Sequence, residues 1–474
     1  MEKLVIFITC LSYVFLPFFA CNLEEIKFPS TIASFSFLND SCIAPCKVIF
    51  SNHSENAIRY EWNFGDGSPI DTVKNPTHTY EIPGEYSIEL KAFGAGATDV
   101  MIKIARIQPE ISFFQSFGGL EDDDGQEVLQ TEDGGYIVVG NTSSEGAGEN
   151  DVYLIKTDSF GVLKWKKTYG GGGFDNGYSV QQTSDFGYII TGSTYSYGAG
   201  GADVYLIKTN SAGGVVWEKT YGSSTFHERG YSIRQTLDGG FVVVGYRSSG
   251  NDDVYLLKIS VSGELIWEKT FGGSLYDYGY SIKESTDGGF IIAGSTRSEG
   301  AGKEDVYLIK TNGAGILEWK KTYGGLDSDS GHSVQQTTDG GYVIVGYSSS
   351  EGAGESDMYL IKTNGAGILE WKKTYGGPDS DSGYSVQQTT DGGYVIVGYS
   401  SSEGAGESDV YLIKTNGAGI LEWKKTYGGP DSDSGYSVQQ TTDGGYIIVG
   451  AVYNGGPRMS DVYLIKTNKD GNVE

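Results

Sequence analysis

A unit of 52 residues, repeated along most of the chain, constrains the fold more than any other feature of the sequence. The tetrapeptide Asp-Val-Tyr-Leu, or a near variant of it, occurs seven times at intervals of 52 residues, apart from one interval of 50. Units 305–356 and 357–408 differ at only three positions. Such a period indicates a stack or ring of like supersecondary units. The copies begin at Asp151, Asp203, Asp253, Asp305, Asp357, Asp409 and Asp461.

Each unit is predicted to contain four short antiparallel strands. Its alternating or fully apolar runs have strand periods, and no segment has the period of a helix. An Asp-Gly-Gly turn and an Asn-Gly-Ala-Gly turn separate two pairs of these runs, as in hairpins. Four strands in about 50 residues are typical of one blade of a β-propeller. In the unit that starts at Gly383, the predicted strands are 383–389, 394–397, 410–414 and 420–427.

The two ends of the array complement each other. Six units carry a tryptophan in the fourth strand, whereas the seventh ends at Glu474 before that strand. Residues 111–119 precede the first complete unit, and Phe117-Gly118-Gly119 aligns with Tyr-Gly-Gly at 427–429. We expect residues Ile111–Gly119 to form the outer strand of the last blade. This would close a seven-bladed β-propeller and remove two exposed sheet edges.

The array resembles the SBBP-like family of bacterial seven-bladed propeller repeats. The resemblance lies in D-G-G-[YF], D-V-Y-L-I-K-T and W-x-K-T-Y-G-G and covers residues 109–474. The third and fourth strands also resemble the repeats of quinoprotein dehydrogenases, whose blades dock through tryptophan. We therefore expect each indole to be buried between blades, with its N–H bonded to the backbone. The six tryptophans are Trp165, Trp217, Trp267, Trp319, Trp371 and Trp423.

Residues 27–107 are predicted to form a separate β-sandwich, because alternating runs are separated there by turn signals. Three motifs follow in order: 62–67 (Trp-Asn-Phe-Gly-Asp-Gly), 78–80 (His-Thr-Tyr) and 83–86 (Pro-Gly-Glu-Tyr). They resemble the PKD domain, an immunoglobulin-like sandwich of extracellular proteins. The resemblance implies a spacer or a module that contacts proteins or glycans. Trp62 and Phe64 are expected in the core, and Asp66 is expected to cap a turn rather than bind a ligand.

Residues 1–20 are predicted to be a signal peptide, with a charged start followed by an apolar run. No later segment is apolar enough to cross a bilayer, so we expect export. The sequence around Cys21 resembles the lipobox of bacterial lipoproteins, which implies that Cys21 is acylated and that 21–26 form a short tether. Phe18 stands where the family has leucine, and plain secretion after cleavage at Ala20 is the alternative.

The four cysteines fit an exported chain. Cys10 lies in the signal peptide and Cys21 is the lipidation candidate, which leaves Cys42 and Cys46. These two could form a disulfide in an oxidising compartment, because Ala44-Pro45 can supply the turn that brings them together. A metal site at this pair is the alternative, although no further Cys or His lies nearby.

The chain is strongly acidic, with a formal net charge of −27. This excludes nucleic acid as a partner and suits cations or basic partners. The loops after the second and fourth strands are acidic and should emerge on one rim. Asp-x-Asp-x-Gly in these loops resembles the start of a calcium loop, so weak calcium binding is one interpretation and a solvated turn is the other. The candidate ligands are Asp327, Asp329, Asp379, Asp381, Asp431 and Asp433.

Catalysis finds little support in the sequence. The histidines are His53, His78, His227 and His332, and none belongs to a catalytic motif. A reaction centre also needs different residues in one place, and near-identical units do not provide them near the axis. We expect no catalytic residue and no cofactor other than calcium.

The sequence therefore predicts a non-enzymatic binding or adhesion protein with an unidentified protein or glycan ligand. It would be secreted, or be held at the cell envelope only through a lipid on Cys21. Two alternatives are a propeller enzyme, either a quinone-dependent dehydrogenase or a polysaccharide-cleaving enzyme, and a structural envelope protein.

Overall fold

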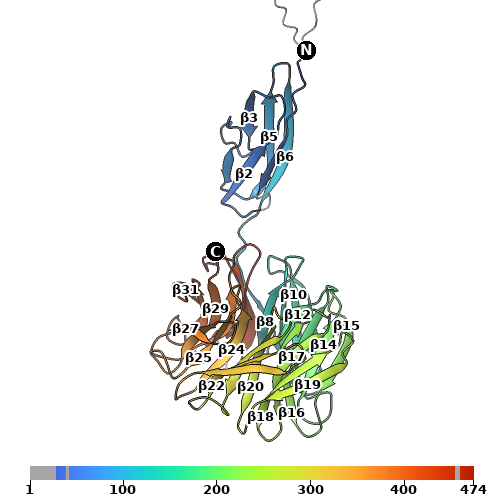
Figure 1. Ribbon diagram of the computed structural model, residues 1–474. Coiled ribbons are helices and arrows are strands. Elements are labelled where there is room, and N and C mark those ends of the chain that lie inside the picture. Colours follow the sequence, from blue (N-terminus) through green and yellow to red (C-terminus); the bar gives the residue numbers. More distant parts are fainter. Residues whose placement is uncertain (1–27, 39–41, 454–458, 474) are drawn as a thin grey trace, which may run out of the picture. The chain divides into compact units, whose positions relative to one another are not determined.

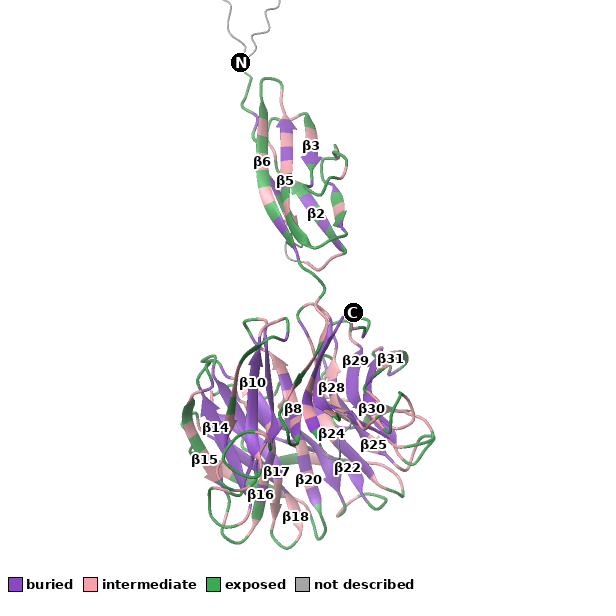
Figure 2. Cartoon of the chain, turned by 180° about the vertical axis from the view of Figure 1, so that it is seen from behind, coloured by how far each residue is buried: buried purple, intermediate pink, exposed green. Residues whose placement is uncertain are grey.

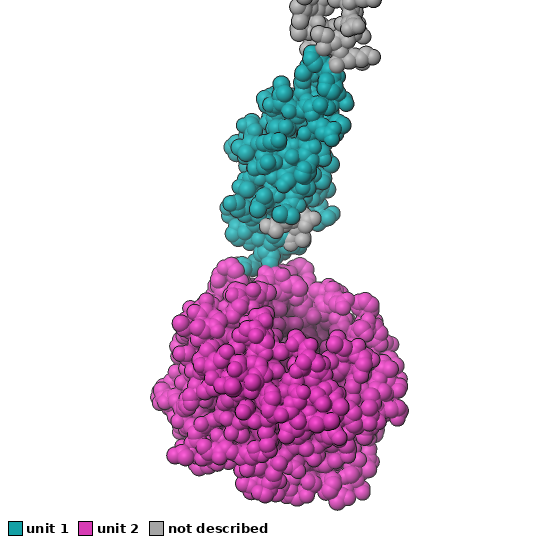
Figure 3. All heavy atoms as spheres, in the orientation of Figure 1, with its two compact units in different colours: residues 1–110 teal, residues 111–474 magenta. Residues whose placement is uncertain are grey.

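The computed structural model describes residues 28–38, 42–453 and 459–473. Every secondary-structure element of these residues is a β-strand. None of the described segments forms a helix suited to crossing a membrane. The chain divides into two compact units, 1–110 and 111–474 (Figure 3). The predicted signal peptide, the tether and Cys21 lie outside the described residues.

Unit 1 is a sandwich of two three-stranded sheets, ordered β1-β2-β4 and β3-β5-β6. Both sheets contribute to one core, in which Trp62 and Phe64 are buried as expected. The Trp62 indole N–H donates to the Val73 carbonyl over 3.0 Å. Cys42 and Cys46 are joined by a disulfide. The strands are β1 (Phe35–Leu38), β2 (Cys46–Asn52), β3 (Arg59–Asn63), β4 (Thr77–Tyr80), β5 (Gly84–Phe93) and β6 (Thr98–Ile107).

Asp66 stabilises a turn in unit 1, as the sequence predicts. One carboxylate oxygen accepts from the Ser68 backbone N–H at 3.0 Å, and the other lies 2.7 Å from the His78 Nε2 atom. Although burial opposes it, hydrogen bonds from Ser68 and His78 lower the pKa of Asp66 to about 2. This carboxylate is therefore occupied by the fold rather than free for a ligand.

The described part of unit 2 contains seven four-stranded antiparallel sheets (Figure 1). Six of them consist of consecutive strands, numbered here in chain order as the first to the sixth sheet. Their strands are β8 (Asp123–Gln130), β9 (Tyr136–Thr142), β10 (Asp151–Thr157) and β11 (Leu163–Tyr169); β12 (Asp175–Gln182), β13 (Tyr188–Thr194), β14 (Asp203–Thr209) and β15 (Val215–Tyr221); β16 (His227–Gln235), β17 (Phe241–Ser248), β18 (Asp252–Ile259) and β19 (Leu265–Phe271); β20 (Asp277–Glu284), β21 (Phe290–Thr296), β22 (Asp305–Thr311) and β23 (Leu317–Tyr323); β24 (Asp329–Gln336), β25 (Tyr342–Ser348), β26 (Asp357–Thr363) and β27 (Leu369–Tyr375); β28 (Asp381–Gln388), β29 (Tyr394–Ser400), β30 (Asp409–Thr415) and β31 (Leu421–Tyr427).

The seventh sheet combines both ends of the unit. It consists of β32 (Ser434–Gln440), β33 (Tyr446–Tyr453) and β34 (Ser460–Thr467), with β7 (Phe113–Phe117) as its fourth strand. Phe117 faces Val462, as Tyr427 faces Val410 in the sixth sheet. The predicted pairing of the N-terminal strand with the last repeat is therefore present in the structure.

Burial follows from the position of each strand within its sheet. The second and third strands are mostly buried, and β9 and β10 are buried along their whole length, because a neighbouring sheet covers each face (Figure 2). The fourth strands, such as β27, carry exposed side chains. The first strand of each sheet lies at the opposite edge from the fourth.

Neighbouring sheets are joined by a repeated hydrogen bond between their first strands. The Ser385 hydroxyl accepts from the Val438 N–H at 3.3 Å, between the sixth and seventh sheets. The Ser437 hydroxyl accepts in the same way from Val128, which links the seventh sheet to the first. A shared apolar cluster also joins β8, β9 and β10 to β33, β34 and β7. These contacts give unit 2 a propeller-like fold.

The tryptophans of the fourth strands are less buried than the sequence predicts. Trp371 is partly exposed and packs edge-on against Tyr394 of the next sheet, with ring centroids 5.9 Å apart. No described protein atom accepts a hydrogen bond from the six indole N–H groups, so the predicted backbone bond is wrong. The neighbouring Tyr375 makes the link between sheets instead, by donating its hydroxyl to the Gly419 carbonyl at 2.7 Å. In the seventh sheet, Phe113 takes the place of tryptophan.

Candidate ligand site in the inner cavity

The acidic loops predicted to share one rim do meet there. The loop after β25 contacts the loop before β24, since the Ser349 N–H donates to the Ser328 carbonyl at 2.9 Å. Glu355 and Asp379 are exposed in adjacent loops of this rim. Neither forms an ion pair with any described lysine or arginine. The same loop sequence in the next sheet places Glu407 and Asp431 at the equivalent positions.

The structure separates the two aspartates of each predicted calcium motif. Asp379 is exposed in the loop, whereas Asp381 is fully buried at the start of β28. One oxygen of Asp381 accepts from the Gly377 N–H at 2.9 Å and from the Ser402 hydroxyl at 2.7 Å. Asp329 and Asp433 are equally buried, and Asp327 and Asp431 correspond to Asp379. The second aspartate therefore fixes the loop, and calcium binding stays a prediction. Within 28–38, 42–453 and 459–473, no group of three or more potential metal ligands occurs.

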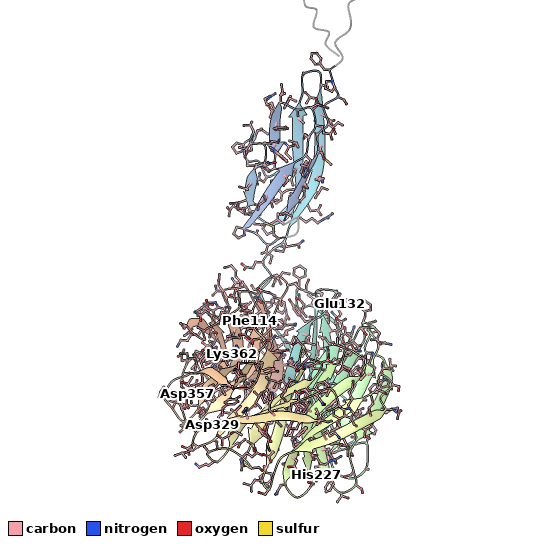
Figure 4. The ribbon with its side chains drawn as sticks, in the orientation of Figure 1. Phe114, Glu132, His227, Asp329, Asp357 and Lys362 are labelled. Carbon is pink, nitrogen blue, oxygen red and sulfur yellow. A yellow bond between two sulfur atoms is a disulfide. The ribbon has the colours of Figure 1, made fainter. Side chains whose placement is uncertain are left out.

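Acidic residues that are buried or half-buried also face each other between sheets. Gly272 lies between Asp253 and Asp277, and a Cβ added to it would come within 1.9 Å and 2.8 Å of their carboxylate oxygens. Burial and the charge of Asp277 raise the pKa of Asp253. Asp357 and Asp381 flank Gly376 in the same way between the fifth and sixth sheets. Figure 4 shows Asp357 at the same end of the fifth sheet as Asp329. These carboxylates hold the rim in place at an electrostatic cost.

The opposite rim contains a repeated ion pair. Lys362 is almost completely buried, and its Nζ lies 2.9 Å from Asp339 of the Asp-Gly-Gly turn and 3.0 Å from Glu370. Although burial opposes it, the hydrogen bonds from Thr337, the Gly341 N–H and Lys362, with the lysine charge, lower the pKa of Asp339 to about 2. Every sheet has such a pair: Lys156–Asp133, Lys208–Asp185, Lys258–Asp238, Lys310–Asp287, Lys362–Asp339, Lys414–Asp391 and Lys466–Asp443.

A cavity of about 430 Å³ is lined by the first strands of all seven sheets. One position of each strand places an aromatic side chain there, apart from Gln126 in the first sheet. Successive rings are in contact, with centroids 5.1 to 5.6 Å apart. The aromatic residues are Tyr178, Tyr231, Tyr280, His332, Tyr384 and Tyr436.

Three charged residues make this cavity asymmetric. Glu127 occupies a position that is serine in the other six sheets, and Arg234 and Lys283 occupy a position that is glutamine in four others. Arg234 Nη2 donates to Glu127 over 2.9 Å. The expectation that near-identical units provide no distinct residues near the axis therefore does not extend to the divergent first, third and fourth sheets. Comparing this strand position by position across the units would have found all three, because they lie in the more divergent copies.

The electrostatics of the three groups differ. Although burial opposes it, the charges of Arg234 and Lys283 lower the pKa of Glu127, which therefore stays ionised. Burial, with the positive charge of Arg234, lowers the pKa of Lys283 to about 7. Among the described residues, nothing forms a hydrogen bond or an ion pair with the Lys283 ammonium. The cavity therefore holds one cation, Arg234, that is paired with Glu127, and one amine, Lys283, that has no hydrogen-bond partner among the described residues.

The four histidines are dispersed. His53 and His78 lie in unit 1, and His227 lies in the acidic rim, where its Nδ1 accepts from the Ala202 N–H at 3.1 Å (Figure 4). His332 is the only one that lines the cavity. Its Nδ1 lies 3.0 Å from the Gly383 carbonyl, to which it donates, and burial lowers its pKa. In unit 1, His53 Nε2 lies 2.8 Å from the Ser36 hydroxyl and His78 Nε2 lies 2.7 Å from Asp66.

Several solved propeller structures are similar to the chain in fold. The Pan2 WD40 domain of Neurospora crassa is 11% identical, with a TM-score of 0.45, and 76% of this chain and 96% of that one are covered. A quinoprotein alcohol dehydrogenase-like protein of Bacteroides thetaiotaomicron is 11% identical, with a TM-score of 0.41 and coverages of 81% and 93%. The polysaccharide lyase Uly1 is 13% identical, with a TM-score of 0.46 and coverages of 75% and 92%. At this similarity they indicate no activity.

No curated protein matches the sequence. The family model of the PKD domain does match, over residues 32–103, which is the part of unit 1 that carries the three motifs. Residues 32–103 therefore belong to the PKD domain family.

Proposed function

We propose that the chain is an exported, non-enzymatic binding protein in which the PKD domain is a spacer and unit 2 is a closed seven-bladed propeller. The observation that carries this proposal is the repeated acidic rim. The exposed carboxylates Glu355 and Asp379 have no cationic partner among the described residues, and they recur one unit later. These two successive pairs of uncompensated carboxylates suit a ligand with a repeated structure of its own, such as a basic protein surface or a glycan. One unit earlier, Lys303 stands in place of Glu355 and pairs with Asp327 at 2.9 Å.

An array of proteins and glycans, probed with the mature chain, tests this proposal. The variant Glu355→Gln/Asp379→Asn/Glu407→Gln/Asp431→Asn should lose the signals that the unchanged chain gives. Removing two acidic groups from the opposite rim, with Glu132→Gln/Glu264→Gln, is the control and should leave them. A set of signals that is indifferent to the rim variant would contradict the proposal. Repeating the array with calcium and with a chelator tests the predicted weak calcium sites.

Export with a lipid on Cys21 is a separate part of the proposal. The N-terminal sequence supports it through the apolar run and the lipobox-like end. Mass spectrometry of the native N-terminus should find an acylated Cys21. Soluble protein with an unmodified Cys21 at its N-terminus would favour plain secretion.

A polysaccharide-cleaving enzyme is the second candidate, since the inner cavity has the distinct residues that a reaction centre needs. Glu127 and Lys283 are an acid and an amine that line one cavity. Chain cleavage that Lys283→Gln abolishes, measured on a panel of polysaccharides, would establish this function over pure binding.

A further inference from the structure

We propose that the inner cavity is a binding site for a carboxylate-bearing sugar, with Lys283 and Arg234 as the groups that select its charge. The site lies away from the acidic loops and does not depend on their proposed role. It rests on the lining of the cavity, on the charge distribution and on the departure of three residues from the repeat pattern.

The charge of the cavity opposes that of the whole protein. Its lining contains the acid Glu127 and the bases Arg234 and Lys283, so it holds one more cation than anion when Lys283 is protonated, in a chain of formal net charge −27. Glu127 is already held by Arg234 and by the Val180 N–H, at 2.9 Å and 2.8 Å. The Lys283 ammonium has no such partner in the described structure. Lys283 is half-buried and shares Glu127 with Arg234 as its nearby opposite charge, so an anionic ligand would stabilise its ammonium form.

Glu127 keeps the hydrogen bond between neighbouring first strands that a serine makes in the other sheets. In other sheets a serine hydroxyl accepts the hydrogen bond from the next first strand, as Ser385 does from Val438. In the first sheet one oxygen of Glu127 accepts the equivalent bond, and the other binds Arg234. Glu127 therefore adds charge to the cavity without removing its contact between sheets. Arg234 and Lys283, by contrast, cannot accept the bond that glutamine takes from the next first strand in sister sheets, as Gln335 does from the Gln388 N–H at 2.6 Å. A function of the cavity explains this departure from the repeat, whereas the stability of the fold does not require it.

The rest of the lining suits a sugar. Tyrosine, serine and glutamine side chains dominate it, and each can donate and accept hydrogen bonds as sugar hydroxyls do. The contacting aromatic rings, such as Tyr231 and Tyr280, also offer edges and faces for the apolar side of a sugar ring. A volume of about 430 Å³ is in the range of sites for one small ligand or the end of a chain.

Isothermal titration of the mature chain with trigalacturonate tests the proposal, and the fully methyl-esterified trisaccharide serves as the uncharged match. We expect binding of the acid and at least about 10-fold weaker binding of the ester, in keeping with hydrogen bonds to charged groups. No binding of the acid, or equal binding of acid and ester, would overturn the proposal. Succinate and inorganic phosphate are the further arms. If they bind as tightly as the acid, the site is a general anion site and the sugar assignment fails.

Variants that restore the repeat pattern separate binding from folding. Glu127→Ser/Arg234→Gln/Lys283→Gln gives the cavity the residues that sister sheets already contain, so it should fold with an unchanged circular dichroism spectrum. It should weaken trigalacturonate binding about 10-fold or more, and Lys283→Gln alone should account for most of the loss. Lys321→Gln, on an exposed outer strand, changes the net charge equally and is the control. Unaltered affinity in the restored variant would refute the site. Turnover of the trisaccharide would instead refute only the non-enzymatic function.

Discussion

The repeated lysine–aspartate pair can be tested by comparing two sheets of the same molecule. Lys208 has Asp185 as its one carboxylate partner within 4 Å, at 2.9 Å, and its side chain is only 6% exposed. Lys362 has both Asp339 and Glu370. Replacing the turn aspartate by asparagine keeps the side-chain oxygen that accepts from the turn and removes only the charge. Asp185→Asn should therefore destabilise the protein more than Asp339→Asn.

The structure sets the size of the effect. Although burial opposes it, hydrogen bonds from Thr183, Lys208 and the Gly187 N–H, with the lysine charge, lower the pKa of Asp185 from 3.8 to about 2. That fall corresponds to about 2.4 kcal/mol of stabilisation before screening. The aspartate is 65% exposed, so solvent reduces its share to about 1 kcal/mol. Leaving the buried Lys208 unpaired adds a further penalty, for about 2 kcal/mol in total. We expect about 1 kcal/mol for Asp339→Asn, because Lys362 keeps Glu370.

Urea unfolding followed by tryptophan fluorescence measures both variants against the unchanged chain. A depressed acid pKa stabilises the fold above the unfolded value of 3.8, and this contribution is lost as the pH falls towards 2. The difference between Asp185→Asn and the unchanged chain should therefore shrink below pH 4. Adding Glu370→Gln to Asp339→Asn should raise its cost to that of Asp185→Asn. Equal costs for the two single variants, or a difference independent of pH, would refute this reasoning.

Four further outcomes follow from the structure. Phe186 has φ of 63° where sister turns have glycine, so Phe186→Gly should raise the unfolding free energy by about 1 kcal/mol in urea titration. Deletion of 111–117 should sharply lower the melting temperature of unit 2, and an unchanged calorimetric transition would contradict its pairing role. Trp371→Ala should cost about 2 kcal/mol in urea, less than for a fully buried indole. The pKa of Asp253 is raised beside Asp277, so its carboxylate lowers the stability of the fold at neutral pH and does so less as the pH falls. Asp253→Asn should therefore stabilise the fold at pH 7 in thermal unfolding, by an amount that declines towards pH 5.

The repeat made the strands and the pairing of the two chain ends predictable. The match between 117–119 and 427–429 placed β7 beside β34 in the observed register. Burial of the tryptophans was overestimated, because a recurring aromatic residue indicates packing but not how much of its ring stays exposed. Trp371 lies at the outer edge of its sheet, where one side of the indole faces solvent.

The inner cavity could not be assembled from the repeat alone. Its charged residues come from the first, third and fourth sheets, and their meeting depends on side chains that cross from one sheet to another. Arg234 reaches Glu127 across more than 100 positions of sequence. The lysine–aspartate pairs were missed for a simpler reason. Both residues recur in every unit, but the turn explained the aspartate and the strand explained the lysine, so neither seemed to need a partner.

The pairing of β7 with β34 determines when unit 2 can be finished. A chain is made from its N-terminus, so Phe113–Phe117 are synthesised long before their partner strand exists. Until Ser460–Thr467 arrive, β7 has an unpaired edge, and the last sheet lacks its outer strand. Pairing β34 with β7 is the last step of folding, and it also has to bring together the two strands of unit 2 that lie farthest apart in the sequence. A chain truncated or stalled before β34 would therefore remain open at this seam, so that the state of one strand pair reports whether unit 2 is complete.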